Sequence, residues 1–292
     1  MANTNSRAEN VDETKTAPAI NAGLYTDSHL FTQTMNRKIL DLFQMSFGRR
    51  PTASQQFIDL GCGPGDSTRE DLLPRCQPCR RIVATDISRQ MIEYAEKHFA
   101  HPQIAYEVHD VESDISGLVQ KYGKFERVYS FMALNWARDT TAAYRNVAGL
   151  MTDDGECLLV VAARVILYRV WRRIVELDRW KKYKKIVERS FPPTQDMEDR
   201  SSLLSYMHSV LASANLKPYT CEVLSINACL DKLQPLIEAS LPVMPILPLL
   251  SDDLKLEFKS DVANVVRTFQ DENPAGGPQR RMDIFIVHAR KI

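Results

Sequence analysis

Residues 58–67, Ile-Asp-Leu-Gly-Cys-Gly-Pro-Gly-Asp-Ser, decide the fold of this chain. An apolar strand that contains Asp59 leads into a turn with glycines at 61, 63 and 65, and the polar residues after it can begin a helix. Glycine lets the backbone turn sharply and approach a ligand where a Cβ would collide. The helix then offers unpaired N–H groups and its positive end to an anion. The stretch therefore predicts a nucleotide-binding strand–turn–helix unit.

The spacing of the glycines distinguishes two kinds of nucleotide site. A dinucleotide fold requires Gly-x-Gly-x-x-Gly, whose third glycine would fall at position 66, where this chain has Asp66. Here the third glycine, Gly65, comes one residue early, and Asp59 stands two places before Gly61. This pattern resembles motif I of the class I methyltransferases, which use S-adenosylmethionine (SAM).

Acidic residues also end the next two predicted strands. Asp86 closes the strand 81–86, where a carboxylate can accept two hydrogen bonds from a ribose diol, and Asp110 closes the strand 104–110. Taken alone, Asp86 is equally explained as the cap of the following helix. Three acids at successive strand ends behind a glycine turn favour a cofactor site.

The resemblance to class I methyltransferases covers residues 24–163 and implies SAM as the cofactor, with no metal ion. In that family a residue at the place of Asp110 holds the adenine amino group, the next backbone N–H meets an adenine nitrogen, and the fourth strand packs against the methionine half. The cofactor contacts it implies are Tyr25, Asp59, Gly61, Gly63, Gly65, Asp86, Ile87, Asp110, Val111 and Ser130.

Strand-like and helical segments alternate beyond the turn. Strands are predicted at 57–60, 81–86, 104–110, 128–134 and 156–162, and later at 219–227 and 281–289. Helices are predicted at 24–47, after Asp66, and at 88–99, 140–150, 165–190, 202–214, 230–240 and 252–269. We therefore predict an α/β fold, the Rossmann-like class I methyltransferase fold, with a mostly parallel seven-stranded sheet, helices on both faces and a helical insertion or cap.

Composition divides the chain into a tail and one domain. Residues 1–22 are polar and almost free of large apolar side chains, which predicts a disordered tail. The resemblance to methyltransferases implies that residues 23–292 form the methyltransferase domain, with a SAM-binding core at about 24–163, a helical insertion at about 165–215, and the last strands with a helical cap at about 216–292.

The candidates for binding the methyl acceptor are Gln33 and Trp136. Trp136 follows the fourth strand, where an indole N–H can face the ligand as a donor, and Gln33 lies in the first helix. Ordinary alternatives are a core aromatic for Trp136 and a solvent-facing helix residue for Gln33.

A resemblance to a narrower group of methyltransferases gives Gln33 and Trp136 a shared role. The segments that carry it are Leu24-Tyr25 with Gln33, Leu134-Asn135-Trp136, Cys157-Leu158-Leu159-Val160 and Val287-His288-Ala289-Arg290-Lys291. They resemble the juvenile hormone acid O-methyltransferases of insects and their arthropod relatives. That resemblance implies that Gln33 and Trp136 grip the carboxylate of a small acid with an apolar tail. Asn135 stands where insect members often have His.

The residue types suit this chemistry. A carboxylic acid is already ionised at neutral pH, so methylating it requires no general base, and none of the six histidines lies in a base motif. His109 precedes Asp110 and is a strand-edge histidine. Two alternatives stay open: a methyltransferase for another small-molecule O or N acceptor, and a SAM-binding partner protein without turnover.

Charge and cysteine content limit the partners and the compartment. Lys and Arg together number 37, the same as Asp and Glu, and this balance argues against a nucleic-acid partner. No apolar run reaches the ~18 residues of a membrane span, and we see no secretory signal. Six scattered cysteines are typical of reduced thiols, so we expect a cytoplasmic protein whose oligomeric state the sequence leaves open.

Overall fold

A computed structural model describes residues 22, 30–227, 241–272 and 281–292 of the chain. Its strands form one seven-stranded sheet in the order β3-β2-β1-β4-β5-β7-β6. The predicted seven-stranded α/β architecture is therefore confirmed. The strands are β1 (Gln56–Leu60), β2 (Arg81–Asp86), β3 (Ile104–Val108), β4 (Phe125–Phe131), β5 (Met151–Arg164), β6 (Leu216–Asn227) and β7 (Arg281–Lys291).

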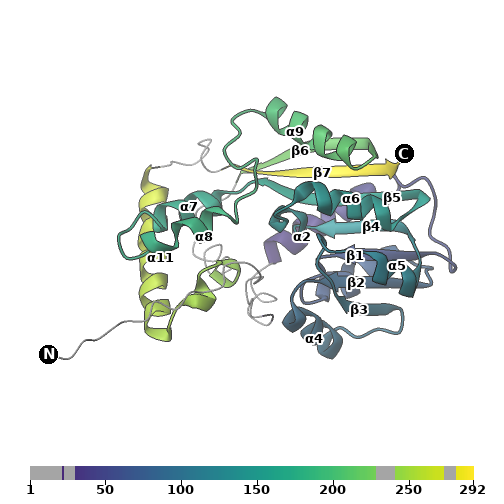
Figure 1. The fold of residues 1–292 in the computed structure, drawn as a ribbon, viewed down its shortest axis with the longest axis horizontal. Coiled ribbons are helices and arrows are strands. Elements are labelled where there is room, and N and C mark those ends of the chain that lie inside the picture. Colours follow the sequence, from purple (N-terminus) through teal and green to yellow (C-terminus); the bar gives the residue numbers. More distant parts are fainter. Residues whose placement is uncertain (1–21, 23–29, 228–240, 273–280) are drawn as a thin grey trace.

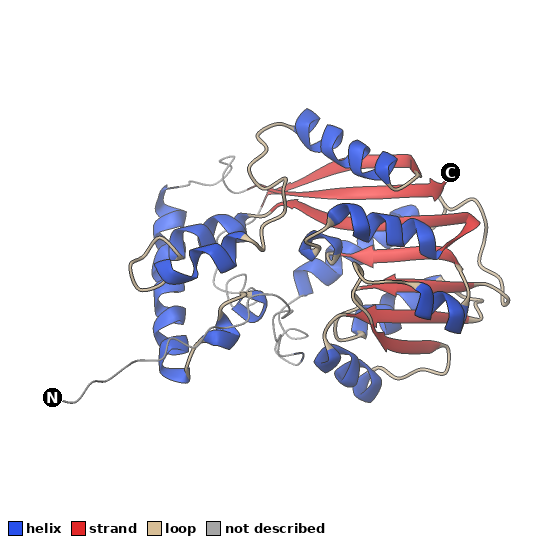
Figure 2. Cartoon of the chain, viewed as in Figure 1, coloured by secondary structure: helices blue, strands red, loops and turns tan. Residues whose placement is uncertain are grey.

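Helices cover both faces of the sheet, and a second group of helices forms a separate lobe (Figures 1 and 2). The helices that accompany the sheet are α2 (Leu30–Phe43), α3 (Leu73–Arg75), α4 (Arg89–His98), α5 (Ser116–Tyr122), α6 (Thr140–Leu150) and α9 (Arg200–Ser213). The lobe, which we call the cap, contains α7 (Ile166–Ile174), α8 (Lys184–Glu188) and α11 (Asp252–Glu272). None of the helices in the described ranges is long and apolar enough to cross a membrane.

The parallel pairing brings the strand ends together at one edge. β1 runs parallel to both β2 and β4, with Leu60 opposite Thr85 and Asp59 opposite Tyr129. β7 lies antiparallel between β5 and β6. In Figure 1 the cap stands across from the edge toward which β4 points. Ligands of open α/β sheets bind outside this carboxyl edge.

The three largest apolar clusters among the described residues form the cores of the two lobes. One packs α5, α6 and α9 on one face of the sheet, and another packs Met35, Ile39 and Leu40 of α2 on the other face. The third lies inside the cap, where Met244 and Ile246 are fully buried against α7 and α11. The segment 241–250 therefore supplies core residues to the cap.

The end of α2 is tied to the far strands of the sheet. His288 Nε2 lies 2.6 Å from Glu156 Oε2, and the Gly48 N–H donates to Glu156 Oε1 at 2.8 Å. The rings of Phe43 and Phe47 meet His288 edge-on, with centroids 6.0 and 5.0 Å away. Burial disfavours the charge on Glu156, but the hydrogen bonds outweigh it, so the pKa of Glu156 lies below its ordinary value. These contacts fix the position of the C-terminal end of α2 on the sheet.

The prediction of one long helix at 165–190 is wrong, because the chain forms α7, a 3-10 turn (Lys181–Tyr183) and α8 there. Trp171 and Trp180 are both buried in the cap cluster. The two tryptophans are nine positions apart, and a helix turns by about 100° per residue, so one straight helix would place them on opposite sides. The break lets both rings face one core, and Trp180 Nε1 donates to Asp261 Oδ2 of α11 at 2.8 Å.

Several predicted boundaries also differ from the structure. The fourth strand ends at Phe131 because Met132 turns to a φ of 56°, and Leu134–Trp136 forms a 3-10 turn. The helix after Asp66 contains a π-helical turn at Thr68–Leu72. The first helix is described from Leu30 to Phe43. The predicted helix at 230–240 and nearly all of the tail at 1–22 lie outside the described residues.

Replacing two buried tyrosines by phenylalanine should change the free energy of unfolding in opposite directions. The Tyr144 hydroxyl is buried without a hydrogen-bond partner among the described residues, whereas Arg127 Nη1 donates to the Tyr129 hydroxyl at 3.2 Å. Tyr144→Phe should raise the free energy of unfolding by about 1 kcal/mol, and the control Tyr129→Phe should lower it by about 1 kcal/mol. Urea denaturation measures both; equal losses in the two variants would contradict this account.

Candidate active site

The glycine turn after β1 is held by backbone hydrogen bonds, and two of its glycines lie too close to neighbouring residues to carry a side chain. The N–H groups of Gly61 and Cys62 both donate to the Thr85 carbonyl, at 2.7 and 2.8 Å. Gly61 has a φ of 78°, and a Cβ placed on it would lie 2.1 Å from the Cβ of Ala133. Gly65 has a φ of 86°, and its Cβ would clash with α4 and β3. The turn is therefore wedged between the ends of β2 and β4.

Asp86 joins the turn to the following helix. Its Oδ2 accepts from the Gly63 N–H at 3.0 Å, and its Oδ1 accepts from the Ser88 N–H at 2.8 Å. Each oxygen keeps a second lone pair for a ligand. Burial raises the pKa of Asp86, and the two backbone hydrogen bonds oppose that rise. The predicted ribose acceptor is thus fixed in place at the strand end.

Asp59 lies beneath the turn in a negative environment. Its Oδ2 accepts from the Thr68 hydroxyl at 2.6 Å. Burial raises the pKa of Asp59 to about 6, the Thr68 bond opposes this, and the charges of Asp86 and Asp66 add to the rise. SAM carries positive charge on its sulfonium and ammonium groups. A cation bound near these three acids relieves their mutual repulsion, so the residues fit this cofactor.

The next strand end offers an apolar and polar surface suited to an adenine ring. Ile87 and Val108 are 50% and 42% exposed, although both are large apolar side chains. Asp110 Oδ1 accepts from the Glu112 N–H at 2.9 Å, and the Val111 carbonyl accepts from Asn146 at 2.8 Å. The turn that carries Asp110 and Val111 is therefore ordered beside exposed apolar side chains.

Two of the predicted cofactor residues stand apart. Ser130 is fully buried and its hydroxyl donates to the Leu60 carbonyl at 2.9 Å, just before Gly61. Its contact with the cofactor stays a prediction. Tyr25 lies outside the described residues. Among the residues that are described, no group of His, Cys, Asp or Glu side chains is placed to hold a metal ion.

Gln33 lies at one end of the glycine turn. Its Nε2 donates to Asp66 Oδ2 at 3.2 Å, which joins α2 to the residue directly after Gly65. One turn further along α2, Arg37 forms an ion pair with Asp71 at 2.7 Å. Gln33 is half-buried, so the exposed-residue alternative does not describe its position.

Trp136 lies at the other end of the turn and is 37% exposed. The backbone N–H of Trp136 donates to the carbonyl of Ala133, the residue that lies directly against Gly61. When the Asn135 amide is oriented to satisfy both of its ends, its oxygen accepts from Trp136 Nε1 at 3.2 Å and its nitrogen donates to the Met132 carbonyl at 3.2 Å. The indole N–H therefore already has a partner within the chain.

One aromatic side chain of the cap, Tyr168, contacts Trp136 and in turn packs against Phe191. The rings of Trp136 and Tyr168 meet edge-on with centroids 6.2 Å apart, and the Phe191 ring lies 5.0 Å from that of Tyr168. The Tyr168 hydroxyl is in hydrogen-bond contact with the Asn135 side chain. This cluster connects the end of β4 to α7, and we call it the aromatic wall.

Several residues of this site were not found from the sequence. Thr68 and Asn135 hold predicted residues in place, Tyr168 comes from the segment predicted as one long helix, and Phe191 follows that segment. The sequence marks Asp66 only as a residue that is not glycine and as one of the polar residues that can begin a helix. Its position directly after Gly65, at a helix start, was the available signal.

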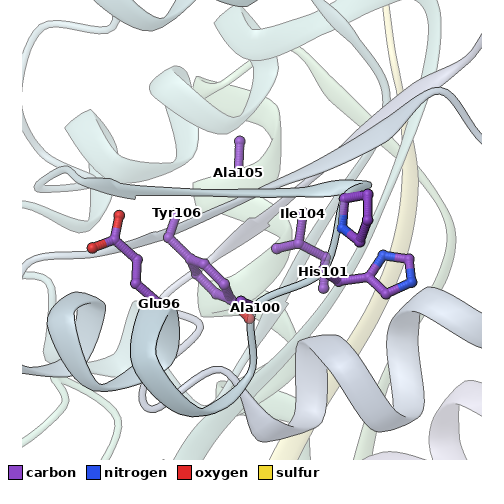
Figure 3. A pocket seen from close by; sticks show the side chains of 7 residues that line it. Glu96, Ala100, His101, Ile104, Ala105 and Tyr106 are labelled. Atoms are coloured by element: carbon purple, nitrogen blue, oxygen red, sulfur yellow. The ribbon is translucent and has the colours of Figure 1, made fainter.

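A surface hollow of ≈ 640 Å³ lies between α4 and β3. In Figure 3 the Tyr106 ring extends from β3 toward α4, where Glu96 lies. The hollow is lined by Glu96, Ala100, His101, Pro102, Ile104, Ala105 and Tyr106, none of which is a predicted site residue.

Comparison with known proteins agrees with the geometry. A family model described as "Methyltransferase domain" matches residues 57–155, from β1 into β5. The fold is similar to a putative methyltransferase from Bacillus halodurans, with a TM-score of 0.55 and 13% identity over 88% of this chain and 99% of that one. A putative sarcosine dimethylglycine methyltransferase from Galdieria sulphuraria gives a TM-score of 0.54 and 16% identity over 88% and 85%. The chain is a class I, SAM-dependent methyltransferase.

The sequence is also similar to two insect enzymes. It is 29% identical to the juvenile hormone acid O-methyltransferase of Bombyx mori over 212 residues, which covers 72% of this chain and 73% of that protein. It is 25% identical to the juvenile hormone acid O-methyltransferase of Drosophila melanogaster over 252 residues, which covers 84% and 82%. The predicted resemblance to this group is confirmed.

The raised pKa of Asp59 predicts a pH dependence for SAM binding. Because a bound cation favours the carboxylate form, protons compete with SAM once the pH falls below about 6. The Kd should be nearly constant from pH 8 to pH 7 and should rise by up to about tenfold per unit below pH 6. In Asp59→Asn the Kd should be higher at pH 8 and should depend less on pH, with a residual slope from Asp86. Calorimetric titration across pH 5–8 tests this, and a wild-type Kd that stays constant would contradict it.

Proposed function

We propose that this enzyme transfers the methyl group of SAM to the carboxylate of a small acid with an apolar tail and so forms a methyl ester. The names of the two insect relatives, both juvenile hormone acid O-methyltransferases, support the carboxyl acceptor. The proposal also assigns the cofactor contacts to Asp59, Asp86, Asp110 and the glycine turn.

The observation that carries this proposal is the pair of side-chain donors at the two ends of the glycine turn. The Gln33 side chain bonds Asp66, and the backbone N–H of Trp136 bonds the carbonyl of Ala133, which lies against Gly61. Amide and indole N–H groups suit a carboxylate, which accepts hydrogen bonds and has no proton to give up.

The residues then have separate roles. When bound, SAM supplies an electrophilic methyl group, whose carbon–sulfur bond is replaced by the carbon–oxygen bond of the ester. Gln33 and Trp136 orient the acceptor carboxylate, and alignment of this kind lowers the barrier of a two-substrate reaction. Because Asn135 already accepts the indole N–H, Trp136 must exchange Asn135 for the acceptor oxygen.

The aromatic wall supports an apolar tail. Tyr168 is 3% exposed and Trp136 is 37% exposed, so the wall offers one open aromatic ring backed by a buried one. Apolar and aromatic side chains with a few polar groups are typical of small-molecule sites.

We also place the enzyme in the cytosol. The five cysteines within the described ranges, Cys62, Cys76, Cys79, Cys157 and Cys221, are free thiols. Free thiols are typical of proteins in reducing compartments.

A product assay with matched variants tests the proposal. Wild-type protein with labelled SAM should form base-labile methyl esters from terpenoid or fatty acids. Trp136→Phe keeps an aromatic ring but loses the N–H, so the KM for the acid should rise about tenfold while the Kd for SAM stays within about twofold. Asp86→Asn should instead raise the Kd for SAM about tenfold. Transfer to amines or alcohols but to no acid would overturn the proposed acceptor, and SAM binding without any product would indicate a non-catalytic protein.

His109 provides a test of base-free transfer. It lies at the end of β3, its Nε2 has no hydrogen-bond partner among the described residues, and burial lowers its pKa. Because a carboxylate needs no base, His109→Gln should change kcat at saturating SAM by less than about threefold. A loss of about a hundredfold or more would favour an acceptor that must be deprotonated.

A further inference from the structure

We propose that Asp66 is a positioning residue of the acceptor site, which fixes the orientation of the Gln33 amide so that one of its N–H bonds faces the acceptor carboxylate. The inference rests on the proposed function, because it takes Gln33 as a donor to that carboxylate. Asp66 would act through Gln33 and would not touch the acceptor itself.

The chemistry of the pair decides the orientation of the amide. A glutamine side chain presents either its oxygen or its NH₂ group to a neighbour, and the two differ little in shape. Asp66 offers carboxylate oxygens, which accept hydrogen bonds, so Gln33 turns Nε2 toward it, and the two atoms lie 3.2 Å apart. Asp66 is 5% exposed and follows Gly65, so its position is set by the turn.

The amide nitrogen carries two N–H bonds, of which Asp66 takes one. No hydrogen bond from the second N–H to another described residue is found in the structure. A neutral amide with two N–H bonds can therefore bridge two carboxylates, that of Asp66 and that of an acceptor. Without this bridge, the Asp66 charge would repel an acidic acceptor.

The contact is not needed to attach α2. One helical turn later, Arg37 pairs with Asp71, which is also buried, and joins the same two helices. Met35, Ile39 and Leu40 add apolar packing against the sheet. Because these anchors already attach α2, the effect of the Asp66 contact that we propose is on the orientation of the Gln33 amide.

The test is a double-mutant cycle on the full-length enzyme with an acid that the wild type methylates. Asp66→Asn can face Gln33 with either end of its own amide, so the Gln33 orientation is no longer fixed. We expect kcat/KM for the acid to fall about tenfold at saturating SAM. In a Gln33→Ala background the same Asp66→Asn change should have less than about a twofold effect, because the group on which it acts is gone.

Two further variants separate positioning from folding. Asp71→Asn removes a matched acid between the same helices and should lower the melting temperature without a selective rise in the KM for the acid. The swap Gln33→Glu with Asp66→Asn rebuilds a hydrogen bond between the two positions but supplies no N–H to the acceptor. It should keep near wild-type stability with the acid KM still raised, and it gives a reading even if Asp66→Asn alone fails to fold.

Two results would overturn the inference. One is an equal effect of Asp66→Asn with and without Gln33, and the other is recovery of wild-type kcat/KM in the swap variant. Either would leave the proposed function standing, because wild-type ester formation is measured in the same assay. Absence of any acid turnover by the wild type would overturn both.

Discussion

The close approach of Gly61 to Ala133 is the constraint on which the rest of the site depends. A Cβ at position 61 would lie 2.1 Å from that of Ala133, so the turn passes between the ends of β2 and β4 only because it is bare backbone. This passage lets the Gly63 N–H reach Asp86 and starts the next helix at Asp66. The predicted ribose acceptor Asp86, the buried acids and the partner of Gln33 are all placed by one turn.

The charges divide the site into an acidic part near the glycine turn and a part with neutral N–H groups. Asp59, Asp66 and Asp86 lie near the turn, and the raised pKa of Asp59 reflects its burial first and these like charges second. Such a cluster favours a cation, which suits SAM. In the proposed function an acid acceptor comes close to the same cluster, and the neutral side chains of Gln33 and Trp136 would offer it N–H groups without adding charge. The site is thus suited to hold a cation and an anion side by side.

Sequence alone predicted the sheet and SAM as the cofactor, because glycine spacing and acids at strand ends are local patterns that parallel strands bring together. The individual cofactor contacts stay predictions. The sequence did not predict the partners of the acceptor donors. Gln33 meets Asp66 across 33 residues, and Trp136 meets Tyr168 of the cap. It also placed Trp171 and Trp180 on one helix, because helical periodicity does not reveal that both rings must share a core. Local patterns identify the edge of the sheet at which the site lies, whereas long-range packing decides which other side chains contribute to that site.

The most direct test of this account is a crystal structure of the enzyme with S-adenosylhomocysteine and an acid that it methylates. The account predicts a carboxylate oxygen about 3 Å from Gln33 Nε2, with Asp66 still accepting from the same nitrogen and the Trp136 indole turned from Asn135 to the acid. A carboxylate bound away from Gln33 and Trp136, or a Gln33 amide that presents its oxygen to the acid, would contradict it.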